Sequence, residues 1–371
     1  RGFVLRGVTV AEEEQVMGCQ VAPGGFGRMG GEVTATTNQL AAYDMATQGK
    51  LTWELDGSRA PAPLDGAFFL GAPLAIDNTL YVMAEIRSAI YLFALDPTTG
   101  KVQWQQQLIG LEQSVGLDSV RRRSGATPSY DAGILVCPTA ASTVVAIDVV
   151  KREFAWVYRY PPEPVTPAEM RNNMWQNQVQ GPVTRSNDRW LDNVAVIGEG
   201  HVFLTPPESS ELHCVDLQTG KLAWKHRQSD SLFVAGVDQG LVLLVGAEGV
   251  QALHVTDGSA AWQQENVPLP SGTLPAGQGY LSDGRYYLPL TTGEITAIET
   301  ASGKLTVFPA AKPGTPLGNL ICYRGSILSQ SALLLDKYEQ LDLLQERVEK
   351  ALAANPDDAT ALRELAELKR T

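Results

Sequence analysis

Histidine and cysteine are the residues of this chain whose chemistry suits metal binding or nucleophilic attack. The four histidines, His201, His213, His226 and His254, are too few and too dispersed for a metal-binding motif. The four cysteines are also far apart, and no Cys-x-x-Cys pair occurs, which argues against a zinc ribbon or a dithiol redox centre. His213 is adjacent to Cys214, and such a pair could activate a thiolate.

A basic run interrupts an otherwise acidic sequence at Arg121, Arg122 and Arg123. Guanidinium groups bind carboxylates and phosphates through two parallel hydrogen bonds, so this run could clamp an anion or an acidic partner. The alternative is a solvated loop. The Gly-rich segment 23–31 has no Gly-Lys-Ser/Thr ending, so we do not expect a phosphate-binding loop there.

One repeated pattern accounts for most of the chain. Each copy has an apolar, a small and an apolar residue, an anchor that is usually Asp, a turn that usually contains Gly, and then Trp. The anchors and their tryptophans are Asp44 with Trp53, Asp96 with Trp104, Asp148 with Trp156, Asp216 with Trp224, and His254 with Trp262. Two further anchors are Glu299, followed by Val307, and Asp336 in a degenerate seventh copy. Successive anchors lie 52, 52, 68, 38, 45 and 37 residues apart, the length of a propeller blade.

Each residue type in the repeat has a structural explanation. The Asp carboxylate can accept hydrogen bonds from the backbone of the turn that follows, and Gly allows the positive φ of a tight turn. Two residues before the anchor the side chain is small, and Cys214 fills a position that is Ala in five other copies. A small buried residue therefore explains Cys214 better than a nucleophile does. His254 likewise stands at an anchor position, which predicts a role in the turn.

Two further strands precede the anchors, as at Leu80–Met83 and Ile134–Cys137. With the strand that ends at the anchor and the strand that carries the Trp, each repeat has four strands. The sequence therefore predicts an all-β propeller of four-stranded blades, with seven repeat units and room for an eighth.

The pattern resembles the pyrroloquinoline-quinone-type propeller repeat over roughly residues 30–336. Relatives with this repeat include quinoprotein alcohol dehydrogenases and the lipoprotein of the outer-membrane barrel-assembly machinery. The resemblance implies the periplasm or cell envelope of a bacterium. Enzymes of this group use an adjacent Cys-Cys disulfide and acidic or amide ligands around Ca²⁺, and this sequence has no adjacent Cys pair. We therefore expect no catalytic residue, no cofactor and no metal.

Residues 160–193 form an insertion that lengthens the third interval. It contains Trp175, Arg189 and Trp190, and these two tryptophans lie outside the repeat. Long insertions in repeat proteins gather on one face and often carry function. Two interpretations stay open: a packed surface loop, or a loop that binds a partner or covers a pocket.

The periodicity changes near Tyr338 from that of strands to that of helices. Leu341, Leu344, Val348 and Leu352 form one apolar stripe, and a second helix follows the break at 355–358. We predict a propeller domain at 1–336 and a helical tail at 337–371. The tail resembles half of a tetratricopeptide repeat, and the alternatives are a hairpin packed on the propeller or the start of a helical array.

Charge and composition limit the partners. The net charge is −12, which disfavours nucleic acid, and no apolar run is long enough to span a bilayer. The first hypothesis is a non-catalytic scaffold that binds other envelope proteins through the propeller face, the insertion 160–193 or the tail. The alternatives are a quinone-linked or polysaccharide-acting enzyme that uses the propeller funnel, and a sensor of a small ligand or anion.

Overall fold

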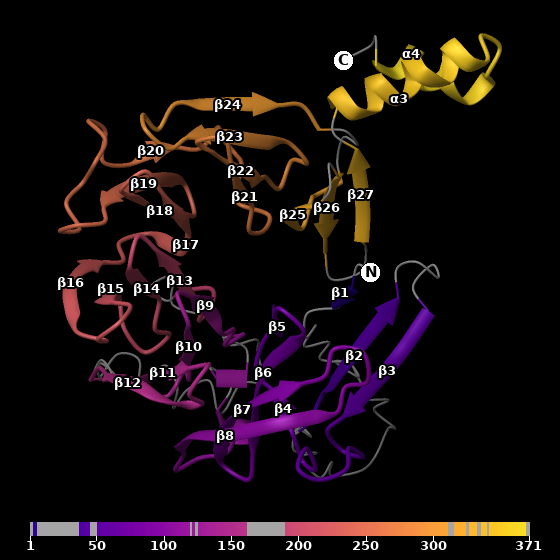
Figure 1. The fold of residues 1–371 in the computed structure, drawn as a ribbon. Helices are drawn as coiled ribbons and strands as arrows, with labels where there is room; N and C mark the ends of the chain where they lie inside the picture. Colours follow the sequence, from indigo (N-terminus) through magenta and orange to yellow (C-terminus); the bar gives the residue numbers. More distant parts are fainter. Residues whose placement is uncertain are drawn as a thin grey trace, which may run out of the picture. The chain divides into compact units, whose positions relative to one another are not determined.

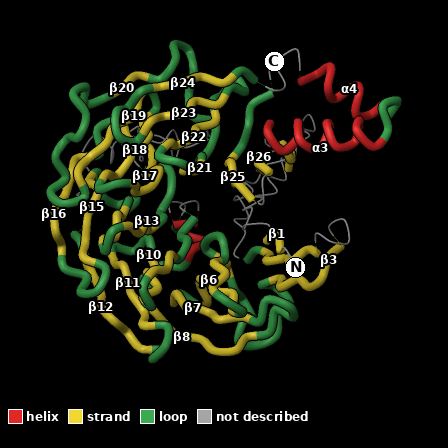
Figure 2. Tube along the Cα trace, turned by 45° about the horizontal axis from the view of Figure 1, so that its top comes forward, coloured by secondary structure: helices red, strands yellow, loops and turns green. Residues whose placement is uncertain are grey.

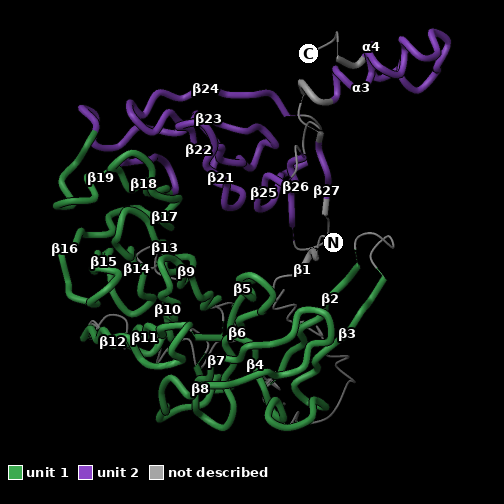
Figure 3. The backbone as a smooth tube through the Cα atoms, viewed as in Figure 1, with its two compact units in different colours: residues 1–246, 253–261 green, residues 247–252, 262–371 purple. Residues whose placement is uncertain are grey.

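The computed structural model describes residues 3–5, 37–44, 50–118, 121–122, 125–161, 190–310, 315–323, 326–331, 335–339 and 341–368. The chain divides into two compact units (Figure 3). Unit 1 comprises Arg1–Gly246 and Leu253–Ala261, and unit 2 comprises Ala247–Ala252 and Trp262–Thr371. The Gly-rich segment 23–31 lies outside the described residues.

Unit 1 is built from successive antiparallel sheets (Figure 1). The first sheet contains β1 (Phe3–Leu5), β2 (Gln39–Asp44) and β3 (Lys50–Asp56). The second contains β4 (Phe68–Phe69), β5 (Leu74–Ile76), β6 (Thr79–Ile86), β7 (Ala89–Leu95) and β8 (Val102–Gly110). The third contains β9 (Ser129–Asp131), β10 (Ile134–Pro138), β11 (Thr143–Asp148) and β12 (Glu153–Arg159). The fourth contains β13 (Ala195–Gly198), β14 (His201–Leu204), β15 (Glu211–Asp216) and β16 (Leu222–Arg227).

The remaining strands form three more sheets. The fifth sheet contains β17 (Ser231–Asp238), β18 (Leu241–Gly246), β19 (Gly249–His254) and β20 (Val267–Pro268). The sixth contains β21 (Tyr280–Ser282), β22 (Arg285–Pro289), β23 (Ile295–Glu299) and β24 (Leu305–Phe308). The seventh contains β25 (Asn319–Tyr323), β26 (Ser326–Gln330) and β27 (Leu335–Glu339). The expected all-β fold of repeated, mostly four-stranded sheets is confirmed.

Neighbouring sheets of unit 1 pack face to face through apolar side chains. Met83 and Leu92 of the second sheet share a buried cluster with Leu135 and Val145 of the third. Similar clusters join the first sheet to the second, the third to the fourth, and the fourth to the fifth. Strand β10 is therefore buried along its whole length, because a sheet between two others has no solvent-facing side.

Small residues make room for the tryptophans within each sheet. Ala146 lies directly opposite Trp156 in the β11–β12 pair, and the register shifts between Ala146 and the next residue. The same arrangement recurs at Ala42 with Trp53, Ala94 with Trp104, and Cys214 with Trp224. The small residue that the repeat requires thus faces the indole of its own sheet at a β-bulge.

Each of four tryptophans also contacts the anchor turn of the following sheet. The indole nitrogen of Trp156 donates to the carbonyl of Leu217 at 2.8 Å, and Gly220 lies against the same ring with φ of +66°. Equivalent indole–carbonyl bonds join Trp53 to Pro97, Trp224 to Val255, and Trp262 to Thr300. The repeat therefore encodes contacts between sheets as well as strands.

The anchor residues hold these turns as the sequence indicates. The carboxylate of Asp96 accepts hydrogen bonds from the backbone nitrogens of Thr98 and Thr99, and Asp216 accepts in the same way from Thr219. The hydroxyls of Thr98 and Thr219 also donate to these carboxylates. These hydroxyl bonds, followed by the backbone bonds, lower the pKa of both aspartates below the ordinary value. The seventh copy departs from the pattern, because Asp336 lies near the start of β27 instead of at the end of a strand.

Two helices follow the last strand, α3 (Leu341–Ala354) and α4 (Ala359–Leu368), and they lie side by side (Figures 1 and 2). Val348 and Ala361 are buried, and Arg347 forms a 3.3 Å ion pair with Glu364. Asp358 caps α4 by accepting hydrogen bonds from the backbone nitrogens of Thr360 and Ala361. The predicted helical hairpin is therefore confirmed. Neither of the described helices is long and apolar enough to cross a membrane.

Candidate functional site

At one end of the first four sheets lie the loops whose sequences differ from one repeat to the next. At this end, the residue that follows the last strand of each sheet donates its backbone hydrogen bond to the residue that precedes the neighbouring strand. Such bonds join Gly57 to Asn38, Leu111 to Ser88, Tyr160 to Ser142, and Gln228 to Ser210. We call this end the loop face, formed by residues 57–67, 87–88, 111–118, 121–122, 139–142 and 205–210. The anchor turns lie at the opposite end.

A buried ion pair lies beneath the loop face of the second sheet. The side chains of Arg121 and Glu85 are 4% and 2% exposed, and their Nε and Oε2 atoms are 2.9 Å apart. Arg121 Nη1 also lies 2.8 Å from Asp118 Oδ2, and Nη2 donates to the carbonyl of Gln113. The other oxygen of Glu85 accepts the backbone hydrogen of Val115 at 2.6 Å. Buried charges are tolerated when they are paired and hydrogen-bonded in this way, so this network holds residues 113–118 against Arg121.

The fixed segment presents an apolar side chain to solvent. Strand β8 is followed by the 3₁₀ turn η2 (Val115–Leu117), in which Val115 is buried whereas Leu117 is 78% exposed. Leu191, at the entry to the fourth sheet, is also exposed, and its backbone nitrogen donates to the carbonyl of Leu232. An exposed leucine on a rigid loop loses little conformational freedom when it enters a partner's pocket, so it suits recognition of a protein.

A second buried polar cluster lies between the third and fourth sheets. His213 Nδ1 lies 3.0 Å from the hydroxyl of Tyr158, and Nε2 lies 3.2 Å from the hydroxyl of Ser209. The ring of Tyr160 stands edge-on to His213, and its hydroxyl donates to Glu208. Burial, together with the charge of nearby Lys225, lowers the pKa of His213 to about 4. His213 is therefore neutral at pH 7 and serves as a hydrogen-bonding element between sheets.

The candidate nucleophile is not activated. Cys214 is fully buried, and burial followed by the nearby Asp216 raises the pKa of its thiol to about 12. Burial also raises the pKa of Cys137. A thiol with a raised pKa carries almost no thiolate at pH 7 and is a poor nucleophile or ligand. The described residues contain no group of three or more His, Cys, Asp or Glu placed to hold a metal ion.

The residues singled out from the sequence occupy different environments. Arg121 and Arg122 are buried, and Arg122 Nη1 donates to the carbonyl of Gly116 at 3.4 Å. Trp190 is also buried, in the cluster between the fourth and fifth sheets. Arg123, Trp175 and Arg189 lie outside the described residues. A role of this set in partner or anion binding stays a prediction.

Sequence reasoning missed Glu85 and Leu117. Glu85 could have been noticed, because it is the one charged residue in the apolar strand Thr79–Ile86, and a charge within a buried strand requires a partner. No pattern distinguishes Leu117 from the other leucines of the chain.

The comparisons with known proteins agree with this architecture. A family model described as outer membrane protein assembly factor BamB (PQQ_2) matches residues 27–168 and 167–317. The structure is similar to that of BamB from Moraxella catarrhalis, with 17% identity, a TM-score of 0.51, and coverage of 82% of this chain and 78% of the other. The computationally designed protein Ika8 is 13% identical with a TM-score of 0.43, covering 82% and 91%. No curated protein matches the chain.

Proposed function

The chain belongs to the PQQ_2 family of the outer membrane protein assembly factor BamB, and from this membership we propose that it is a protein-binding scaffold of the bacterial cell envelope. The family name describes assembly of outer-membrane proteins, a task that requires contacts with other proteins. The proposal places this chain in the periplasm, where its loop face binds an envelope protein.

Family membership carries the proposal, and the exposure of Leu117 is the observation that points to the loop face as the binding surface. Its side chain stands on a segment held by the buried charges of Glu85 and Arg121 and by the half-buried carboxylate of Asp118. A buried ion pair contributes little net stability compared with apolar packing of the same volume. It does impose one geometry on the segment, and a fixed geometry is what a binding loop needs.

The polar groups that could perform chemistry are instead used within the fold. His213 bonds to Tyr158 and Ser209 between two sheets, and Cys214 is a neutral buried thiol. These observations favour a scaffold over an enzyme. The proposal also assigns partner contacts to the insertion 160–193, with Trp175, Arg189 and Trp190, and to the tail 337–371.

The test is site-specific photo-crosslinking in the source bacterium. A photoreactive amino acid replaces Leu117 in one strain and Val150 in another. Val150 is 86% exposed in the turn after β11, at the end opposite the loop face, so it is a matched control. We expect a defined set of envelope proteins to be crosslinked from position 117 and not from position 150.

Identical adducts from the two positions, or none from either, would count against a binding role for the loop face. A chain lacking residues 337–371 tests the tail in the same way. Purification of the protein with a stoichiometric quinone chromophore and Ca²⁺ would favour the enzyme alternative.

A further inference from the structure

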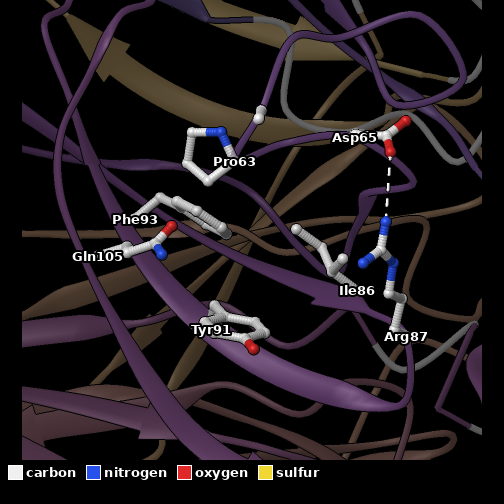
Figure 4. A pocket seen from close by; sticks show the side chains of 8 residues that line it. Pro63, Asp65, Ile86, Arg87, Tyr91, Phe93 and Gln105 are labelled. Carbon is white, nitrogen blue, oxygen red and sulfur yellow. Dashed lines mark ion pairs between the residues drawn. The ribbon is translucent and has the colours of Figure 1, made fainter.

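A small, half-open pocket with both polar and apolar lining residues lies at the loop face between the linker that leaves β3 and the strands β6–β8. Its volume is about 270 Å³. Phe93 and Tyr91 of β7 point to the same side of the sheet, with ring centroids 5.9 Å apart, and Pro63 faces them across the opening (Figure 4). Phe93 is fully buried and forms the floor, whereas Tyr91 and Ile86 are half-buried.

The size of this pocket limits its ligand. Pockets that enclose drug-sized molecules or cofactors have volumes of about 300–1,000 Å³. A slightly smaller space with aromatic walls suits one bulky apolar side chain, such as that of Phe, Leu or Met, projecting from an extended peptide. Polar groups that could orient the peptide are found at the edge, where Gln105 and the exposed Arg87 line the opening.

Arg87 is fixed at this edge by its backbone. Arg87 and Ser88 have φ of +51° and +59° and form the two-residue turn of the β6–β7 hairpin, in which Ile86 pairs with Ala89. This is the backbone of a type I′ turn, which Asn-Gly or Asp-Gly usually forms. A non-glycine residue at positive φ costs about 1 kcal/mol or more. Asn or Gly at this position would close the hairpin with less backbone strain, so the turn places an arginine there at a cost in stability.

The guanidinium of Arg87 has capacity for a further ligand. Its Nη2 atom lies 3.5 Å from Asp65 Oδ2, and the two side chains are 84% and 62% exposed. Such a long, exposed pair is weak. One carboxylate at one nitrogen leaves other donors of the five available, and Figure 4 shows the guanidinium beside Ile86 at the pocket edge.

We propose that this pocket binds an extended peptide segment in which a bulky apolar residue precedes an acidic residue. The apolar side chain enters between Pro63, Tyr91 and Phe93. The following Asp or Glu carboxylate accepts charge-assisted hydrogen bonds from Arg87. This site lies on the same loop face as Leu117 but uses other residues, so the inference rests on the proposed scaffold function and deepens it. Loss of peptide binding with crosslinking from position 117 retained would reject this site alone.

Calorimetric titration of the full chain with short peptides tests the site. The probe has Phe followed by Glu, flanked by Gly and Ser, and in the control peptide Gln replaces Glu. We expect saturable binding of the Phe-Glu peptide, and binding of the Phe-Gln peptide that is about two- to fivefold weaker, the effect of one ion pair to an exposed arginine.

Three variants separate recognition from folding. Arg87→Gln is expected to abolish the preference for the Phe-Glu peptide, and Asp65→Asn to strengthen binding of that peptide by removing the competing carboxylate. Arg285→Gln, which breaks a similar exposed pair with Glu299 in unit 2, is the control and should change neither. The proposal would be overturned if the native chain showed no saturable binding, or bound both peptides with equal affinity. It would also be overturned if the Arg87→Gln variant, shown to be folded by circular dichroism, bound the peptides as the native chain does.

Discussion

The guanidinium carbon of Arg152 lies 5.7 Å from the centroid of the Trp104 ring in the preceding sheet. Other anchor turns place glycine at this position, and the backbone is the same in each. The nitrogen of Arg152 donates to the carbonyl of Asp148 at 2.8 Å, as that of Gly220 does to Asp216. Arg152 also has a positive φ of +58°. A cation over the indole thus replaces close glycine–indole contact in the third sheet.

Two substitutions at Arg152 should have different effects on the free energy of unfolding. Arg152→Ala keeps the strained φ and loses the cation–π contact, so we expect a loss of about 0.5–1 kcal/mol. Arg152→Gly loses the same contact but relieves the strain, which offsets about 1 kcal/mol. The urea midpoint of the glycine variant should therefore be close to that of the native chain. The urea midpoint of the alanine variant should be lower than both. Alanine and glycine variants of equal stability would contradict this account.

The other anchor turns predict that glycine is required by contact as well as by φ. A Cβ atom on Gly220 would lie 2.5 Å from Cδ2 of Trp156. We expect Gly220→Ala to lower the free energy of unfolding by about 1–2 kcal/mol from its φ and by a further 1–3 kcal/mol from overpacking. Gly200→Ala is the matched control, because Gly200 has φ of +75° and open space around it. Urea denaturation measures the free energy of unfolding of both variants, and the control should lose only the part that comes from the positive φ. Equal losses in the two variants would show that the contact with Trp156 does not add to the cost.

The regular part of the fold could be predicted because each repeat uses the same residues for the same contacts. Asp216, Gly220 and Trp224 each have one explanation that recurs along the chain, and the structure places the strands of the second, third and fourth repeats accordingly. In the fifth repeat Trp262 lies outside the short strand β20. The last copy was harder. Leu333, Leu334 and Leu335 fit several registers, so the position of Asp336 within β27 could not be derived.

The loop face could be predicted only in part, because it depends on side chains that the repeat does not specify. Three consecutive arginines suggest a solvated or anion-binding loop, since arginine is usually exposed. Burial of Arg121 depends on Glu85, which lies 36 residues earlier, and a single sequence gives no sign of that pairing. The pocket around Phe93 combines a linker, a turn and three strands, and no single sequence pattern brings these segments together.

The buried ion pair predicts strongly coupled substitutions. Arg121→Met leaves the Glu85 carboxylate buried without its charged partner, so we expect it to lower the free energy of unfolding by about 3–5 kcal/mol. Glu85→Leu combined with Arg121→Met removes both charges and should cost less than Arg121→Met alone. Urea midpoints of the two proteins measure this difference. The account fails if the double variant is less stable than the single variant.

The buried histidine predicts a loss of stability in mild acid. The pKa of His213 is about 4 in the folded chain, against an ordinary 6.5, chiefly because of burial and then Lys225, with Glu211 opposing. The unfolded chain therefore takes up the proton first as the pH falls. The contribution of His213 is fully present above pH 6.5 and is lost progressively towards pH 4, by up to about 3 kcal/mol.

Thermal unfolding between pH 7.5 and 4.5 measures this effect in the native chain and in His213→Gln. The glutamine can still hydrogen-bond but does not titrate, so the stability advantage of the native chain should shrink as the pH falls. His254→Gln, at an exposed anchor position, is the control and should follow the native chain. Parallel curves of stability against pH for the native and His213→Gln proteins would contradict this account. They would show that protonation of His213, between the third and fourth sheets, does not cause the loss of stability in acid.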